Sequence, residues 1–159
     1  MKKFIFILTG VLTFIDQILK YLVINNLEEF SSIRVIPNFF HLTFIKNDGA
    51  AFSILSGGRW FFIGIGVIAL IFLIRYIFLD KKICKFDVVS YSLVLSGILG
   101  NLIDRICYGS VIDYLDFYLY KYNAPVFNFA DMCIVIGGFM IIYTLVVKGD
   151  SDENIYSRK

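Results

Sequence analysis

Two aspartates, Asp113 and Asp131, stand in or beside strongly apolar stretches of this sequence, where a single carboxylate would be costly. A charge in the hydrocarbon region of a membrane is penalised by about 3 kcal/mol or more, so such residues are rare and usually mark a site or a pathway. Two adjacent carboxylates that share one proton can supply both the base and the acid that amide hydrolysis requires. The pair therefore indicates possible acid–base catalysis without a metal.

Further polar residues accompany the two aspartates. Candidates for a supporting or binding role are Asp16, Lys20, Asn47, Asn101, Asp104, Arg105 and Asn128. Asp16 and Lys20 also have the i, i+4 spacing of a helical ion pair, and the asparagines could be turn or helix-packing amides. Arg105 could reach lipid headgroups, and Asp104 could cap a helix or pair with Arg105.

Structural roles also remain open for the other ionisable residues. Asp113 and Asp131 could cap helices or form an ion pair with Arg105. We predict that Asp116 is solvated, because it lies close to an aromatic outer segment. We predict that His41 is an ordinary outer-loop residue, because no nucleophile or metal cluster surrounds it in the sequence.

The histidine and cysteine content of the sequence does not favour a metal site or a redox enzyme. One histidine excludes the usual zinc-ligand spacings, and the three cysteines, Cys84, Cys107 and Cys133, form no CxxC motif. We therefore expect no metal site, no cofactor and free thiols. A formal net charge of +2 does not indicate a nucleic-acid partner.

The elements that position these residues are predicted from composition. The chain is 58% hydrophobic, against roughly 45 to 50% for soluble domains. This predicts an all-α membrane protein in which residues 1–159 form a single domain. A span needs about 20 mostly apolar residues, and four segments qualify: 4–24, 60–79, 88–107 and 127–147. The first should be retained as a helix, because no A-x-A-like cleavage site follows it.

Charge and alternation predict the orientation. Basic residues at the N-terminus, in the short segment 80–85 and at the C-terminus place both termini in the cytoplasm. The longer connections 25–59 and 108–126 then lie outside. Alternation over residues 39–45 and the turn signal Asn47-Asp48-Gly49 predict a small extracytoplasmic β element. The aromatic residues of segment 114–122 could form an interfacial belt or a substrate surface.

The same topology predicts that the polar residues converge. Counting helix rise places Asp16, Lys20, Arg105 and Asp131 in the outer half of the membrane. Asp113 follows the third span and Asp131 begins the fourth, so an antiparallel hairpin would bring both to one membrane face.

Five ordered blocks of the sequence resemble the lipoprotein signal peptidases of bacteria, also called signal peptidase II. The blocks are Phe14-Ile15-Asp16-Gln17-Ile18-Leu19-Lys20, Asn47-Asp48-Gly49-Ala50-Ala51-Phe52, Gly100-Asn101-Leu102-Ile103-Asp104-Arg105, Val111-Ile112-Asp113-Tyr114 and Phe127-Asn128-Phe129-Ala130-Asp131. The departures are Tyr114, where the family often has Phe, and Cys133, which replaces a commoner small residue. Neither changes an ionisable motif position.

The resemblance implies an intramembrane aspartic endopeptidase of the bacterial cell membrane, with its active site towards the outer face. Its partners would be membrane lipid and diacylglyceryl-modified prolipoproteins, which it would cut before the lipidated cysteine. Asp113 and Asp131 would be catalytic. Asn47, Asn101, Arg105 and Asn128 would line the site, with support from Asp16 and Lys20. A β-cradle is implied around residues 39–52, and we expect a monomer.

Three other functions remain open from the residues themselves. A transporter or proton conductor would need polar steps in both membrane halves, whereas the inner halves of the spans offer few. A non-catalytic assembly protein would use the aspartates as structural ion pairs. A peptidase with a Ser/Lys dyad is disfavoured, because Lys20 has no evident serine partner at its depth. The sequence does not identify which prolipoproteins would be substrates.

Overall fold

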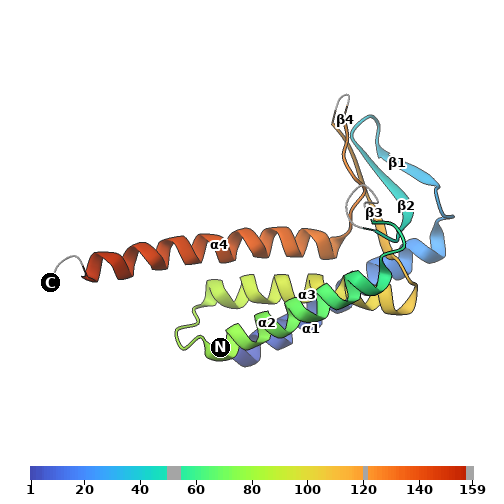
Figure 1. Ribbon diagram of the computed structural model, residues 1–159. Coiled ribbons are helices and arrows are strands. Elements are labelled where there is room, and N and C mark those ends of the chain that lie inside the picture. The colour runs from blue at the N-terminus through green and yellow to red at the C-terminus, as the bar shows by residue number, and fades with distance from the viewer. Residues whose placement is uncertain (50–54, 120–121, 157–159) are drawn as a thin grey trace.

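The computed structural model describes residues 1–49, 55–119 and 122–156. It contains four helices: α1 (Lys2–Asn26), α2 (Arg59–Leu79), α3 (Lys85–Cys107) and α4 (Phe129–Tyr156). Four strands, β1 (Ser32–Ile36), β2 (Phe40–Asn47), β3 (Val111–Leu119) and β4 (Tyr122–Asn123), form a sheet in the order β1-β2-β3-β4. The sheet stands across one end of the helices, and both chain ends lie towards the other end (Figure 1).

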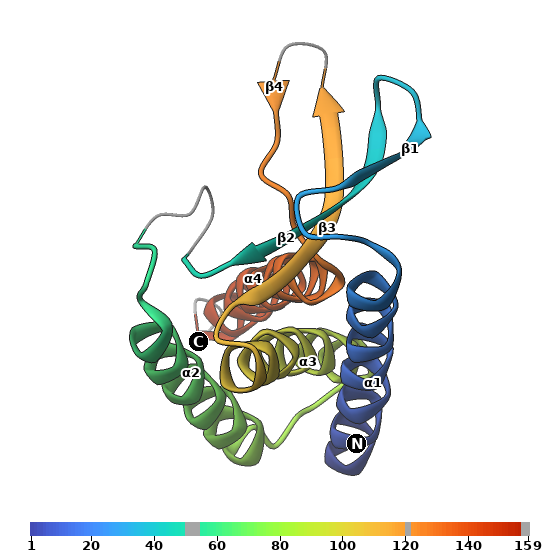
Figure 2. The same ribbon diagram turned by 90° about the vertical axis from the view of Figure 1, so that its right-hand side faces the viewer.

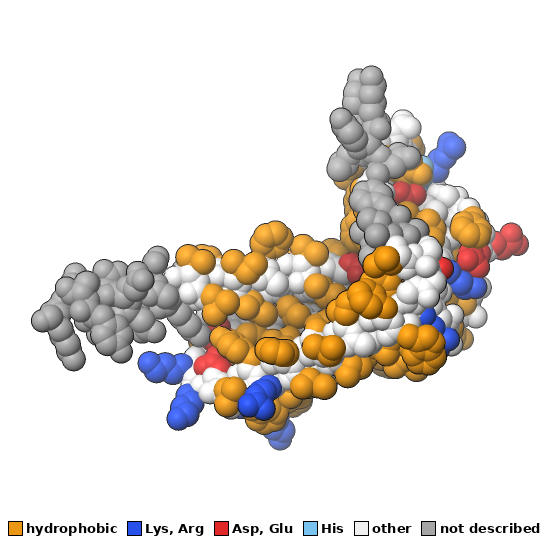
Figure 3. All heavy atoms as spheres, viewed as in Figure 1, with side chains coloured by type: hydrophobic (Ala, Val, Ile, Leu, Met, Phe, Trp, Pro, Cys, Tyr) orange, Lys and Arg blue, Asp and Glu red, His pale blue; other side chains and the backbone are white. Residues whose placement is uncertain are grey.

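Each of the four helices is long and apolar enough to cross a membrane, which confirms the four predicted spans. In α3, 61% of the most apolar window is buried, against 6 to 17% in the other three helices, so α3 is the central helix. Figure 2, viewed towards the sheet end, shows α1, α2 and α4 around it. Apolar side chains cover much of the helical surface in Figure 3, as contact with lipid requires.

Small residues on α3 allow its neighbours to approach closely. A Cβ atom on Gly97 would clash with the backbone carbonyl of Ala130 on α4, and one on Gly100 would clash with the Asp16 carboxylate of α1. Close approach at small residues is a general feature of packed membrane helices. Here it brings the polar residues of α1 and α3 against the first turn of α4.

The sheet is larger than the sequence predicted. The expected β element in the first outer segment is present as β1 and β2, but the second outer segment also forms strands, β3 and β4. The antiparallel register of β2 and β3 pairs Ile45 with Asp113 and Asn47 with Val111. The aromatic residues that suggested an interfacial belt are equally suited to strands, so composition alone did not separate the two structures.

A hydrophobic cluster fixes the sheet to the end of α1. Val23 of α1 packs with Phe44 of β2 and with Ile112 and Tyr114 of β3, and all four are buried. Because residues alternate between the faces of a strand, burial of Ile112 and Tyr114 turns Asp113, between them, to the opposite side of β3. Packing of the sheet on α1 therefore aims Asp113 away from the cluster.

Candidate active site

Asp113 is held on β3 by two side-chain amides. It is 2% exposed, and its carboxylate accepts hydrogen bonds from Asn47 Nδ2 at 2.9 Å and Asn128 Nδ2 at 2.7 Å. Asn47 lies on the neighbouring strand, where its register opposite Val111 brings it within reach of Asp113. The strand pairing therefore supplies one donor, and the segment leading into α4 supplies the other.

Asp131 lies in the first turn of α4 and both caps the helix and faces the cavity. Its Oδ2 accepts the backbone N–H of Asn128 at 3.1 Å, while the backbone N–H of Asp131 donates to Asn128 Oδ1 at 3.0 Å. This is the reciprocal arrangement of a capping box. Its Oδ1 accepts a hydrogen bond from Asn101 Nδ2 at 2.7 Å. Asp131 thus does cap the helix, as one alternative interpretation of the sequence suggested, but the capping hydrogen bond uses only Oδ2.

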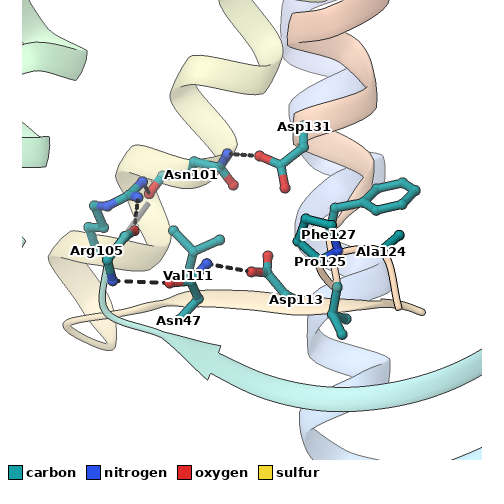
Figure 4. A pocket seen from close by; sticks show the side chains of 11 residues that line it. Asn47, Asn101, Arg105, Val111, Asp113, Ala124, Pro125, Phe127 and Asp131 are labelled. Carbon is teal, nitrogen blue, oxygen red and sulfur yellow. Dashed lines mark hydrogen bonds between the residues drawn. The ribbon is translucent and has the colours of Figure 1, made fainter. Parts of the chain in front are cut away.

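The two carboxylates point towards one another across a cavity of about 340 Å³ (Figure 4). Asn128 and Asn101 connect them, since Asn128 Nδ2 also donates to Asn101 Oδ1 at 3.2 Å. The expected convergence of Asp113 and Asp131 at one face is confirmed. The cavity also includes residues that the sequence analysis did not select: Gly49, Val111, Ala124, Pro125, Val126 and Phe127.

The protonation of Asp113 suits acid–base chemistry near neutral pH. Burial raises its pKa to about 7, and the negative charge of Asp131 acts in the same direction. The hydrogen bonds from Asn47 and Asn128 oppose this shift but do not cancel it. A proton can therefore remain on the pair at a pH where an ordinary aspartate would be ionised.

Arg105 lines the cavity without forming an ion pair with either aspartate. Its guanidinium donates to the carbonyl oxygens of Gly49 at 3.2 Å and Asn101 at 3.4 Å, and lies 5.0 Å from the ring centroid of Phe62. Over residues 1–49, 55–119 and 122–156, the ion pairs join Lys20 to two acids and Lys46 to Glu29. The ion-pair alternative for the two aspartates is therefore wrong.

Lys20 lies at the centre of a buried polar cluster beneath the cavity. It is 1% exposed, and its Nζ is 2.9 Å from Asp16 Oδ2 and 2.7 Å from Asp104 Oδ2. The same ammonium group donates to Asn101 Oδ1 at 3.1 Å. The predicted Asp16–Lys20 pair is confirmed, while Asp104 pairs with Lys20 rather than with Arg105.

The acids of this cluster also bind backbone groups of neighbouring elements. Asp16 Oδ1 accepts the N–H of Ala130 at 3.0 Å, and Asp104 Oδ2 accepts the N–H of Ile112 at 3.2 Å. Gln17, which the sequence analysis did not select, donates to Asp104 Oδ1 at 3.0 Å. An amide side chain beside Asp16 on a membrane helix was a usable signal, because such a polar group needs a partner in lipid.

Two predictions for the sheet are wrong. Asp116 is not solvated: it is 5% exposed and accepts a hydrogen bond from Thr43 Oγ1 at 2.6 Å. The pairing of β2 with β3 buries it. His41 lies within β2 rather than in a loop, and its ring centroid is 4.3 Å from that of Tyr118.

The prediction of free thiols is confirmed. Cys84 and Cys107 are exposed, Cys133 is buried, and none of the three forms a disulfide. Among the described residues, no group of three or more His, Cys, Asp or Glu side chains could hold a metal ion. The Ala50-Ala51-Phe52 part of the second sequence block lies outside the described residues.

Comparison with known proteins gives matches to one family over most of the chain. A family model described as Signal peptidase (SPase) II matches residues 8–147. The lipoprotein signal peptidase of Alteromonas mediterranea is 41% identical over 94% of this chain and 85% of its own length. That of Symbiobacterium thermophilum is 37% identical over 89% of this chain and 94% of its own. A solved bacterial membrane enzyme is 35% identical, with a TM-score of 0.85, and the match covers 92% of this chain and 90% of that one.

Proposed function

This chain belongs to the signal peptidase II family and is a protease that removes signal peptides from prolipoproteins; from that premise we propose that Asp113 and Asp131 are its catalytic pair. The observation that carries the proposal is the opposition of two carboxylates, from β3 and α4, across one cavity. Family membership decides against the transporter and assembly-protein alternatives. The ion pairs of Lys20 with Asp16 and Asp104 argue against a Ser/Lys dyad.

The pair works with one proton shared between its members. The ionised carboxylate accepts a proton from water while the water oxygen attacks the scissile carbonyl carbon, and the protonated carboxyl group donates to the carbonyl oxygen. The C–N bond then breaks as its nitrogen takes a proton from the pair, and a hydroxyl group of the tetrahedral intermediate returns a proton to the pair as the product carboxyl group forms, which restores the shared proton. The products are the carboxyl end of the signal peptide and a new amino group on the mature chain. The raised pKa of Asp113 supports this cycle near neutral pH.

The surrounding donors hold the pair and the substrate. Asn47 and Asn128 fix the two oxygens of Asp113, and Asn101 fixes one oxygen of Asp131. Arg105 carries a positive charge into the cavity without neutralising the dyad. We assign it to carbonyl oxygens of the substrate backbone, because a planar guanidinium presents several donors in fixed directions.

A second, mostly apolar cavity supports a lipid-modified substrate. It has a volume of about 280 Å³, lies between α2, α3 and α4, and shares Asn101 and Arg105 with the catalytic cavity. Its apolar lining consists of Phe62, Ile65, Gly66, Ala69, Ile98, Leu102 and Ile134. An acyl chain of a diacylglyceryl-cysteine placed here would hold the peptide bond that precedes the cysteine beside the dyad.

The proposed orientation places the sheet and the cavity at the outer face of the bacterial cell membrane. Both chain ends lie towards the end of the helices opposite the sheet (Figure 1). Lys2 and the basic loop between α2 and α3 also lie at that end, as expected for a cytoplasmic face. We propose a monomeric enzyme, which is supported by the fact that a single chain supplies both aspartates and their donors.

The test is incubation of the purified protein with a diacylglyceryl-modified prolipoprotein and with its unmodified form. We expect cleavage of the modified form only, directly before the cysteine. Equal cleavage of both forms would show that the enzyme does not require a lipid-modified substrate. Cleavage by a variant that lacks Asp113 or Asp131 would contradict the assignment of these residues as catalytic.

A further inference from the structure

The face of the sheet that carries Asp113 extends well beyond the catalytic cavity. On β2, Asn47 points towards Asp113. The register of β2 against β3 shifts between Leu42 and Ile45, but Leu42 and Phe44 both pack on the cluster against α1, which turns Thr43 and His41 to the opposite face. Phe44 points the other way, into the cluster against α1. The catalytic face of β2 therefore continues from Asn47 past Ile45 to the polar side chains of Thr43 and His41.

A break in the alternation of β3 turns Asp116 to this same face. Tyr114 and Leu115 both pack on the cluster against α1, and their backbone N–H groups both donate to the carbonyl of Phe127, at 3.0 and 2.7 Å. Two successive residues that share one partner are typical of a β-bulge, which re-aims the side chains that follow. Asp116 consequently returns to the side of Asp113.

Strand β1 completes the surface. Ser32 is paired with Thr43, and Arg34 with His41, so both point to the same side. The side-chain oxygens of Ser32 and Thr43 are 2.9 Å apart, and Thr43 donates to the buried Asp116. We name this surface the polar sheet face, and it consists of Ser32, Arg34, His41, Thr43, Asp116 and Tyr118.

The polar sheet face has binding capacity that the protein does not use internally. Within the described parts of the chain, His41 Nε2 is buried and has no hydrogen-bond partner. Arg34 is exposed and forms no ion pair with any described residue. A free guanidinium on a surface continuous with the catalytic face is suited to a carboxylate of a bound chain.

We propose that the polar sheet face binds the polypeptide that follows the lipidated cysteine, and that Arg34 favours an acidic residue in that segment. This inference rests on the proposed function. The signal peptide on the other side of the cut is apolar and stays among the spans, whereas the mature chain is polar and must leave the membrane. The sheet stands across the end of the helices, and its strands extend sideways past them (Figure 1), so a chain that leaves the cavity over the sheet lies outside the helices.

The structure offers a matched control on the opposite face of the same sheet. Lys46 alternates with Asn47 and Ile45, lies over the Phe44 ring and pairs with Glu29 at 3.0 Å. Arg34→Gln and Lys46→Gln each remove one positive charge from the sheet. Only Arg34→Gln removes it from the polar sheet face.

The experiment compares two diacylglyceryl lipopeptides, a short one that ends at the cysteine and a long one that continues with an acidic segment. Because exposed ion pairs contribute about 0.2 to 1 kcal/mol, we expect Arg34→Gln to raise KM for the long substrate about 1.4-fold to fivefold with unchanged kcat. Neither the short substrate nor the Lys46→Gln variant should show the change. Arg34→Glu should prefer a long substrate with a basic segment.

Three results separate the explanations. An unchanged KM for the long acidic substrate in Arg34→Gln would overturn the inference. An equal rise of KM for both substrates would also overturn it and assign Arg34 to lipid headgroups. Failure of the unaltered enzyme to cleave either lipopeptide would instead contradict the proposed function.

Discussion

At the scale of single residues, the central feature is that each catalytic candidate has its own set of amide donors. Asp113 is held by Asn47 and Asn128, and Asp131 by Asn101 and the backbone of Asn128. Asparagine in place of either aspartate keeps size and much of this hydrogen bonding. The chemical role of the proton can therefore be separated from the structural role.

Asp113→Asn and Asp131→Asn should each lower kcat by at least about 100-fold, the smaller end of typical general acid–base contributions. If the two aspartates act as one unit, kcat of the double variant should be scarcely lower than kcat of either single variant. Turnover of lipid-modified substrate and thermal stability in detergent should be measured together. Loss of turnover with gross unfolding would favour a structural pair.

Asp116→Asn is the matched control for burial. Asp116 is also a buried aspartate of β3, but it does not line the catalytic cavity. We expect its kcat to stay near that of the unaltered enzyme, although loss of the charged acceptor of Thr43 should lower stability. A loss of kcat like that of Asp113→Asn would show that burial, rather than position, explains the effect.

The pKa of Asp113 predicts the pH dependence of both activity and stability. Its folded-state pKa of about 7 exceeds its ordinary value of 3.8, so the folded protein binds more protons between these values. The resulting stabilisation is complete below pH 3.8 and is lost as pH rises through about 7. Activity should also fall as pH rises through about 7, because the dyad then loses its acid.

Thermal unfolding of the unaltered protein and of Asp113→Asn from pH 4 to 9 measures this effect on stability. The difference in Tm, Asn variant minus unaltered protein, should increase with pH up to about 7 and then level off. A difference that does not change with pH would show that Asp113 titrates as an ordinary carboxylate.

Arg105→Lys tests the geometry of the guanidinium. The lysine keeps the charge but cannot donate to Gly49 and Asn101 together while stacking on Phe62. We expect kcat/KM to fall by about 10-fold or more, equivalent to about 1.4 kcal/mol of lost transition-state stabilisation. An unchanged value would indicate that Arg105 acts only as an interfacial charge.

At the scale of helices and strands, buried side chains join elements that are distant in sequence. Lys20 of α1 binds Asp104 and Asn101 of α3, and Asp16 of α1 binds the first turn of α4. Arg59, at the start of α2, donates to the carbonyls of Arg105 and Ile106 at the end of α3, both at 2.8 Å. These contacts hold the ends of all four helices around the cavity.

Lys20→Met should weaken this junction strongly. It leaves Asp16 and Asp104 buried without their shared cation, and breaking a buried ion pair on one side typically costs about 3 to 5 kcal/mol. The free energy of unfolding in detergent measures the effect. A stability within about 0.5 kcal/mol of the unaltered protein, the range usual for surface substitutions, would show that the cluster is not structural.

At the scale of the whole molecule, the orientation in the membrane can be tested with the native cysteines. Cys84 and Cys107 are both exposed and flank α3 at its opposite ends, while Cys133 is buried. An impermeant thiol reagent applied to intact cells should label Cys107 and spare Cys84. After permeabilisation both should react, and rapid labelling of Cys84 from outside would reverse the proposed orientation.

The sequence by itself determined the four spans, the convergence of the polar residues and the family. Each of these follows from local properties of the sequence. The lengths of the apolar segments predict the spans, the cost of charges in the membrane predicts that the polar residues lie together, and five short sequence blocks indicate the family. Asp16 and Lys20 could be paired from their spacing for the same reason, since a helix fixes neighbours three and four residues apart.

Only the tertiary structure decided β3, the burial of Asp116 and the contacts of Lys20 with Asp104 and Asn101. Each depends on groups far apart in the sequence, because strand register and helix contacts are set by packing against other elements rather than by local composition. Packing of the sheet on α1 turns Asp113 towards the cavity, and the β2–β3 pairing buries Asp116. The sequence indicated the polar residues that line the cavity, and the fold decided which of their atoms meet.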